Sequence, residues 1–160
     1  SPEWQNTHRA WDAVGVPGSW TPCAAQTGGQ TGGTTMPAPS TTIPEVKPNG
    51  SFQTAMAISQ SGTSVVGTLA SLSDSGFFKM TLAAGATLSL RLDVPAKADY
   101  DLYVYNSNGT LIAKSENGLG LAETLSVRNT GTAAFTRYVR VVPYEGTLGA
   151  QSPYTLRLSW

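Results

Sequence analysis

After Pro44 the chain consists of short segments in which apolar and polar residues alternate, separated by clusters of Gly, Asn, Asp and Ser. Because successive side chains of a strand point to opposite faces, this alternation predicts strands that bury one face. Spacings of roughly 8 to 15 residues without a helical period predict an all-β fold, an antiparallel, jelly-roll-like β-sandwich of about eight strands. The strands are expected near Thr63–Leu69, Phe77–Leu82, Ala86–Val94, Asp99–Tyr105, Leu111–Ser115, Ala122–Arg128, Phe135–Val142 and Tyr154–Trp160.

The segment Ala98–Tyr105 is dense in aromatic and β-branched residues and runs directly into a turn. Its alternation predicts that Leu102 and Val104 face the core together with Tyr100, while Tyr103 and Tyr105 lie on the outer face. Large amphipathic rings on an outer face form either a second packed layer or a contact surface.

The composition before Pro44 is different. Residues 18–44 contain no charged residue and are mostly Gly, Ser, Thr and Pro. Such a segment cannot bury enough apolar surface to offset its ordering entropy, so we expect a flexible linker that leads to a separate domain over residues 45–160.

A short helix is predicted for residues 1–17, with Ser1 as N-cap and a largely apolar stripe along one face. The chain starts without Met, so we expect it to be a fragment of a longer, processed protein. Cys23 is the single cysteine, and it is either incidental or half of a disulfide whose partner lies upstream. The stripe consists of Trp4, His8, Trp11 and Val14.

Several functions are disfavoured by composition. The formal net charge is zero and charged residues make up 12% of the chain, so we expect no nucleic-acid partner. No apolar run is long enough for a membrane span. His8 is the only histidine, and H-E-x-x-H is absent. Since the sequence offers no set of residues that could act together as nucleophile, base and metal ligands, the fragment itself is not expected to be an enzyme. The chain is expected to be a monomer.

One family resemblance rests on several ordered motifs between Ile43 and Trp160. The run Asp99–Tyr105, followed by Asn108-Gly-Thr110 and Ala113-Lys-Ser115, resembles the D-x-D-L-Y-x-Y, D-G-T and A-x-S pattern of the bacterial pre-peptidase C-terminal domain. This resemblance implies an accessory β-sandwich of a secreted, extracellular bacterial protease. Further matching segments are Glu45-Val-Lys-Pro-Asn49, Thr54-Ala55, Gly76-Phe-Phe78 and Gly131–Val141.

A second resemblance covers the N-terminal residues. The stretch Glu3–Val16 is similar to the final helix of thermolysin-like zinc metallopeptidases, whose catalytic domain ends in A-W/F-x-A-V-G-V. The resemblance implies that residues 1–17 end an upstream catalytic domain, which would hold the zinc and calcium, with no cofactor in this fragment. In vibriolysin- and pseudolysin-type members a cysteine after this helix bonds back to the catalytic domain, and Cys23 stands in the comparable place.

A calcium site is the sharpest metal hypothesis. In collagen-binding relatives of the pre-peptidase family, an opening E-x-E-x-N-D segment and later Asp residues bind calcium, and Glu45, Asn49 and Asp74 match this pattern. Lys47 stands where a second Glu is required, so we expect no calcium here. Separately, Asp99 and Asp101, which lie with Tyr103 on the outer face of their strand, form either another small cation site or a solvated end of the sheet.

Aromatic side chains suggest a binding surface for an extended polymer such as collagen or another insoluble protein. Alternatively, these rings pack under loops. The candidate substrate-binding residues are Tyr103, Tyr105, Tyr138 and Tyr144.

Taken with the two resemblances, these features predict a non-catalytic C-terminal accessory domain of a secreted thermolysin-like zinc metalloprotease that assists attachment to substrate. The alternative is a secretion, folding or maturation element that is removed by proteolysis in the linker, since exposed unstructured backbone is readily cleaved.

Overall fold

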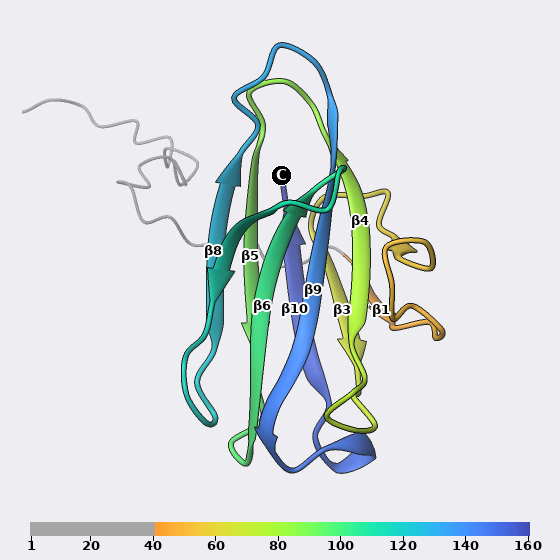
Figure 1. Ribbon diagram of the computed structural model, residues 1–160, viewed down its shortest axis with the longest axis vertical. Coiled ribbons are helices and arrows are strands. Elements are labelled where there is room, and N and C mark those ends of the chain that lie inside the picture. Colours follow the sequence, from red (N-terminus) through yellow and green to blue (C-terminus); the bar gives the residue numbers. More distant parts are fainter. Residues whose placement is uncertain (1–40) are drawn as a thin grey trace, which may run out of the picture. The chain divides into compact units, whose positions relative to one another are not determined.

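The computed structural model describes residues 41–160. In it, the segments of alternating apolar and polar residues form strands of two five-stranded sheets (Figure 1). The all-β sandwich is therefore confirmed. The predicted N-terminal helix, Cys23 and residues 18–40 of the predicted linker lie outside the described residues. In chain order the elements are β1 (Thr41–Pro44), β2 (Met56–Ala57), β3 (Thr63–Gly67), β4 (Gly76–Leu82), β5 (Thr87–Asp93), β6 (Ala98–Asn106), β7 (Leu111–Ser115), β8 (Glu123–Arg128), β9 (Phe135–Gly146), the short 3₁₀ helix η1 (Gly149–Gln151) and β10 (Tyr154–Ser159).

The first sheet has the order β1-β3-β10-β5-β8. In β5, Leu88, Leu90 and Leu92 are buried and the residues between them are more exposed, as the period of two requires. β10 repeats this pattern, and its register pairs Leu158 with Leu90. Aligned apolar pairs of this kind make a continuous inner face.

The second sheet has the order β2-β4-β9-β6-β7, so that β9, whose residues Tyr138–Val142 are mainly apolar, lies at its centre. Tyr100, Leu102 and Val104 of β6 are fully buried in the core, which confirms the predicted inner face. The Tyr100 ring meets the Tyr154 ring of the first sheet edge to face, with 6.1 Å between centroids. The two sheets thus share one hydrophobic interior.

Two short strands lie outside the eight predicted ones, and the second falls in Ser51–Ile58, whose sequence fits either a strand or one helical turn. β1 pairs in parallel with β3, and β2 pairs in parallel with β4, so both sheets are mixed, although most pairs are antiparallel as expected. β1 falls within the range predicted as linker. Its Pro44 lacks a backbone donor, which is tolerated because β1 is an edge strand. Neither strand has enough alternating residues to be recognised by period.

The connection between β7 and β8 passes from the second sheet to the first. Gly120 in this connection donates its backbone N–H to the Ala98 carbonyl at 2.8 Å and has a φ of +71°. A Cβ at this position would approach the Ala96 carbonyl oxygen within 2.8 Å. Glycine therefore lets the connection lie against the start of β6. No helix among residues 41–160 is long and apolar enough to cross a membrane.

Candidate functional site

The outer face of the second sheet carries the four predicted contact tyrosines. Register places Tyr105 of β6 opposite Tyr138 of β9, and Tyr103 opposite Arg140. Further along, the pairing of β6 with β9 shifts between Asp99 and Tyr100. The structure divides the tyrosines into two groups on this face: Tyr105 with Tyr138, and Tyr103 with Tyr144.

The first group packs around a phenylalanine. The Phe52 ring centroid lies 4.9 Å from that of Phe77, 5.3 Å from that of Tyr105 and 5.1 Å from that of Tyr138. The guanidinium of Arg140 lies 5.2 Å from the Phe77 centroid. We call these four rings the Phe52 cluster. Tyr105 and Tyr138 thus form a packed layer beneath the loop that carries Phe52, and such ring pairs add to the stability gained by burial.

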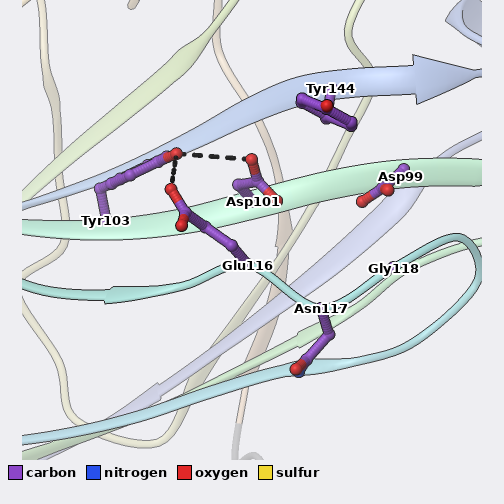
Figure 2. Close-up of a pocket in the computed structure, with 7 residues that line it drawn as sticks. All are labelled: Asp99, Asp101, Tyr103, Glu116, Asn117, Gly118 and Tyr144. Carbon is purple, nitrogen blue, oxygen red and sulfur yellow. Dashed lines mark hydrogen bonds between the residues drawn. The ribbon is translucent and has the colours of Figure 1, made fainter.

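The second group lines a hollow of about 410 Å³, which we call the acidic pocket (Figure 2). Its walls come from β6, from the end of β9 and from the β7–β8 connection. Tyr144 is 67% exposed, so its ring is available to a partner. The lining residues are Asp99, Asp101, Tyr103, Glu116, Asn117, Gly118 and Tyr144.

Tyr103 is tied to the carboxylates of the acidic pocket (Figure 2). Its hydroxyl lies 2.6 Å from Glu116 Oε1 and 3.4 Å from Asp101 Oδ2. Burial and the hydrogen bond to Glu116 raise the pKa of Tyr103, so the phenol remains a donor. The Lys114 ammonium lies 2.7 Å from Glu116 Oε2, and its hydrogen bond, with that from Tyr103, lowers the pKa of Glu116.

Asp99 and Asp101 are the buried carboxylates of the acidic pocket. They are only 5% and 7% exposed, and Asp99 Oδ1 has no hydrogen-bond partner within the described residues. Burial, followed by the negative charges of Asp99, Glu116 and Glu123, raises the pKa of Asp101 to about 6. Burial and the nearby Glu145 also raise the pKa of Asp99. The pocket therefore holds negative charge that the described part of the chain compensates poorly.

A buried glutamate holds the pocket wall in place. Glu123 is fully buried, accepts the backbone N–H of Asn117 at 2.9 Å and also accepts a hydrogen bond from the Ser115 hydroxyl. The Asn117 amide in turn donates to the Ala122 carbonyl at 2.9 Å. These bonds fix the β7–β8 connection over Asp99 and Asp101, so the pocket is a formed feature of the fold.

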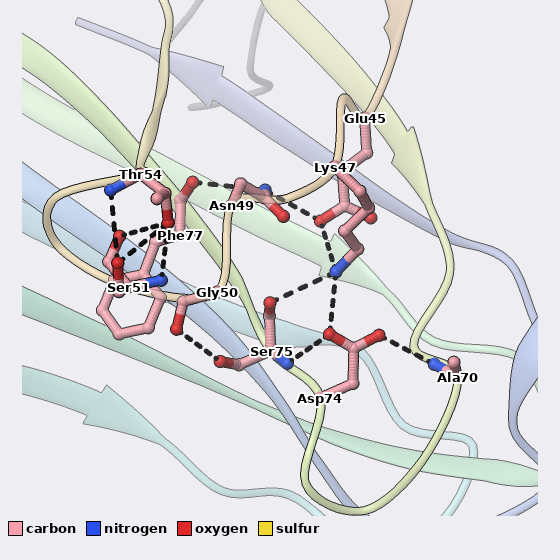
Figure 3. Close-up of polar contacts among 10 residues, drawn as sticks. All are labelled: Glu45, Lys47, Asn49, Gly50, Ser51, Thr54, Ala70, Asp74, Ser75 and Phe77. Carbon is pink, nitrogen blue, oxygen red and sulfur yellow. Dashed lines mark hydrogen bonds and ion pairs between the residues drawn. The ribbon is translucent and has the colours of Figure 1, made fainter.

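The predicted calcium residues come together elsewhere, near the start of the sandwich (Figure 3). The Lys47 ammonium lies 3.3 Å from Glu45 Oε1, 3.1 Å from Asp74 Oδ1 and 3.2 Å from the Ser75 carbonyl oxygen. Asn49 donates to Glu45 Oε1 at 3.0 Å. An ammonium thus occupies the space among oxygen atoms where a cation would bind.

The contacts around Lys47 also change the pKa of Asp74. Partial burial would raise the pKa of this carboxyl, but the hydrogen bond from the Ala70 N–H and the nearby Lys47 outweigh burial, so the pKa is lowered. Within residues 41–160, no three His, Cys, Asp or Glu side chains are arranged to hold a metal ion. The expectation of a calcium-free site remains a prediction.

Sequence reasoning did not identify Phe52, Glu116, Asn117 or Gly118. Lys114 and Glu116 are two residues apart, so strand alternation would have placed both on the face that carries Tyr103. Phe52 has no such signal, because it lies in an irregular segment whose position depends on distant strands.

The fold and the site define a ten-stranded β-sandwich domain with a packed aromatic layer and an acidic pocket on one outer face. No protein-family model matches the sequence, and no curated protein matches it either. Among solved structures, the chain is similar to the pre-peptidase C-terminal domain of a collagenase from Bacillus anthracis. The TM-score is 0.53 at 11% sequence identity, over 66% of this chain and 94% of that chain. This likeness supports a fold of the pre-peptidase C-terminal type.

Proposed function

We propose that residues 41–160 form a non-catalytic C-terminal accessory domain that attaches a secreted, thermolysin-like zinc metalloprotease to collagen or another insoluble protein. The observation that carries the proposal is the acidic pocket, an open hollow beside the highly exposed Tyr144 ring. Exposed aromatic rings next to formed pockets are typical of protein-binding surfaces. The likeness to a collagenase domain supports the same function.

The sequence resemblances supply the rest of the proposed protein. Residues 1–17 would end the upstream catalytic domain, which would bind zinc and calcium and hydrolyse peptide bonds. Cys23 would form a disulfide with that domain, consistent with a secreted, extracellular bacterial protein. Residues 18–40 would tether the sandwich, and the tether would raise the concentration of the protease at a surface that the sandwich has bound. The chain would act as a monomer.

Co-sedimentation of the full chain with insoluble collagen fibrils tests attachment. We expect the chain to pellet with the fibrils, and Tyr144→Ala to weaken pelleting about five-fold, because an exposed ring is the part of this face best placed for contact. Phe135→Ala is the matched control, since Phe135 is also an exposed aromatic residue of β9 but lies outside the acidic pocket. No pelleting of the native chain would contradict attachment, and equal loss with both variants would contradict attachment through Tyr144.

A second candidate function is a secretion, folding or maturation element. It is favoured by the uncharged, Gly-, Thr- and Pro-rich residues 18–40, which offer a proteolytic site ahead of a sandwich that encloses its own core. Deleting residues 41–160 from the parent protein would then impair export or processing, while the native chain would not pellet with collagen. Measurement of extracellular parent protein by immunoblotting separates the two functions.

A further inference from the structure

We propose that the acidic pocket binds the guanidinium group of an arginine side chain in a partner polypeptide. The inference rests on the proposed function of attachment to protein and specifies its chemistry. The carboxylates of Asp99 and Asp101 would accept hydrogen bonds from the guanidinium, and the Tyr144 ring would contact its flat face.

The unpaired carboxylate is the first step of the argument. Asp99 is 5% exposed, yet Oδ1 has no hydrogen-bond partner among the described residues, although the side chain lines the pocket. Removing a carboxylate oxygen from water without a partner is costly. A donor supplied by a ligand would remove this cost, and a cationic donor would also neutralise the charge shared with Asp101.

Residues 41–160 supply no free cation to the pocket lining. Lys114, on the neighbouring strand β7, is engaged by Glu116 at 2.7 Å. Arg140 lies opposite Tyr103 in the register, but its guanidinium lies over the Phe77 ring in the Phe52 cluster. The other titratable groups that act on the pocket, Glu123 and Glu145, add negative charge.

The contacts of Lys47 show how this chain satisfies a similar set of oxygens. The Lys47 ammonium lies 3.3 Å from Glu45 Oε1 and 3.1 Å from Asp74 Oδ1 (Figure 3). In the acidic pocket the comparable carboxylates, Asp99 and Asp101, have no basic side chain beside them among the described lining residues (Figure 2). The partner is therefore expected to bring the positive group.

The shape of the pocket favours an organic cation over a metal ion. No three carboxylates of residues 41–160 converge in a metal-binding arrangement. A hollow of about 410 Å³ is much larger than one ion needs, and two of its lining residues, Tyr103 and Tyr144, are aromatic. A guanidinium is planar, carries five donors in a fork and stacks on aromatic rings, so it matches carboxylates beside an exposed tyrosine better than an ammonium does.

Titration of the full ¹⁵N-labelled chain at neutral pH with Nα-acetyl-arginine amide tests the inference by NMR. We expect the backbone amide signals of Asn117 and Gly118 to shift, with millimolar affinity for so small a probe. Nα-acetyl-citrulline amide has nearly the same shape without the charge, and we expect at least ten-fold weaker binding. Nα-acetyl-lysine amide should bind a few-fold more weakly than the arginine probe.

Substitutions locate the binding. Asp101→Asn and Asp99→Asn should each weaken arginine binding about five- to ten-fold, the loss typical of removing one charge-assisted contact. Tyr144→Ala removes an exposed ring without disturbing the core and should weaken binding about three-fold. Asp93→Asn is the control, because Asp93 lies on the other sheet in ion pairs with Arg91 and Arg157. This variant should bind the arginine probe with the affinity of the native chain.

Several results would overturn the inference: equal affinity for citrulline and arginine, equal effects of Asp93→Asn and Asp101→Asn, or micromolar binding of CaCl₂ with shifts at Asn117 and Gly118.

Failure of attachment to collagen can be distinguished from failure of arginine binding in the acidic pocket. Native pelleting on collagen with no arginine binding would refute only the pocket inference. Arginine binding without pelleting would refute attachment to collagen and leave the pocket assignment standing.

Discussion

Neutralising Asp101 should make the fold more stable at neutral pH while it weakens the proposed binding. The carboxylate is 7% exposed and lies among the charges of Asp99, Glu116 and Glu123, which together with burial raise its pKa to about 6. Its ionised form is therefore disfavoured in the folded protein and unconstrained in the unfolded chain. Asp101→Asn keeps the shape of the side chain and an oxygen that can accept from Tyr103, but removes the charge.

The size of the effect follows from the pKa difference. The ordinary value is 3.8 and the folded value is about 6, and one pKa unit corresponds to about 1.4 kcal/mol. The upper limit is therefore about 3 kcal/mol. Relaxation of the pocket and counter-ions will reduce it, so we expect Asp101→Asn to raise the free energy of unfolding by about 2 kcal/mol at neutral pH.

The pH dependence has a definite sign. Because the pKa of Asp101 is higher in the folded state, the folded protein binds this proton more tightly than the unfolded chain does. The contribution of Asp101 to stability is present below about pH 4, where both states are protonated, and is lost as pH rises through about 6. The native chain and the Asp101→Asn variant should therefore differ little near pH 4 and most above pH 7.

Urea denaturation of both proteins at pH 4 and pH 7.5 measures this difference, with Asp93→Asn as the control for a lost surface carboxylate. A variant that is less stable than the native chain at pH 7.5, or a stability gain of equal size at both pH values, would refute the reasoning. A gain accompanied by weaker arginine binding would show that stability has been given up for a charged binding site.

Three further substitutions test the contacts described above, each by urea denaturation. Lys47→Met should lower the free energy of unfolding by about 2 kcal/mol, because it leaves the Glu45 carboxylate without its cation and the Glu45 side chain is only 3% exposed. An unchanged stability would contradict the role of that ion pair. Gly76→Ala should lower the free energy of unfolding by about 2 kcal/mol or more, since the added Cβ would approach the Tyr154 hydroxyl within 2.8 Å and also meet Glu45. Gly118→Ala is the control, because open space surrounds Gly118, and it should change the free energy of unfolding little. Phe52→Ala should lower the free energy of unfolding by about 2 kcal/mol, because it removes the ring around which the Phe52 cluster packs. A stability loss no greater than that of Phe135→Ala would contradict a stabilising role of the Phe52 cluster.

The strands and their inner faces could be predicted because alternation is local. In β5 and β10 the leucines alternate with polar residues, and in β6 Tyr100, Leu102 and Val104 recur at every second position; each inner face is as predicted. β1 and β2 could not be assigned as strands from the sequence, because a strand of two to four residues shows no period. Their pairing depends on where β3 and β4 lie, which the local sequence does not specify.

The candidate site was only partly predictable. Tyr103, Tyr105, Tyr138 and Tyr144 were proposed in advance as one contact surface, but their division between the Phe52 cluster and the acidic pocket was not predicted. The division depends on the position of the loop that carries Phe52 and on the irregular pairing of β6 with β9. Both are contacts between residues far apart in the chain.

The sequence by itself determined the class of fold, the outward direction of Asp99 and Asp101, and the presence of a lysine where a calcium ligand would stand. Only the tertiary structure decided that these two outward carboxylates are buried, because the β7–β8 connection, fixed by Glu123, folds over them. It also decided that the Lys47 ammonium lies among the oxygens of Glu45 and Asp74. Alternation sets the face on which a side chain lies, whereas burial and charge compensation depend on which distant segments cover that face.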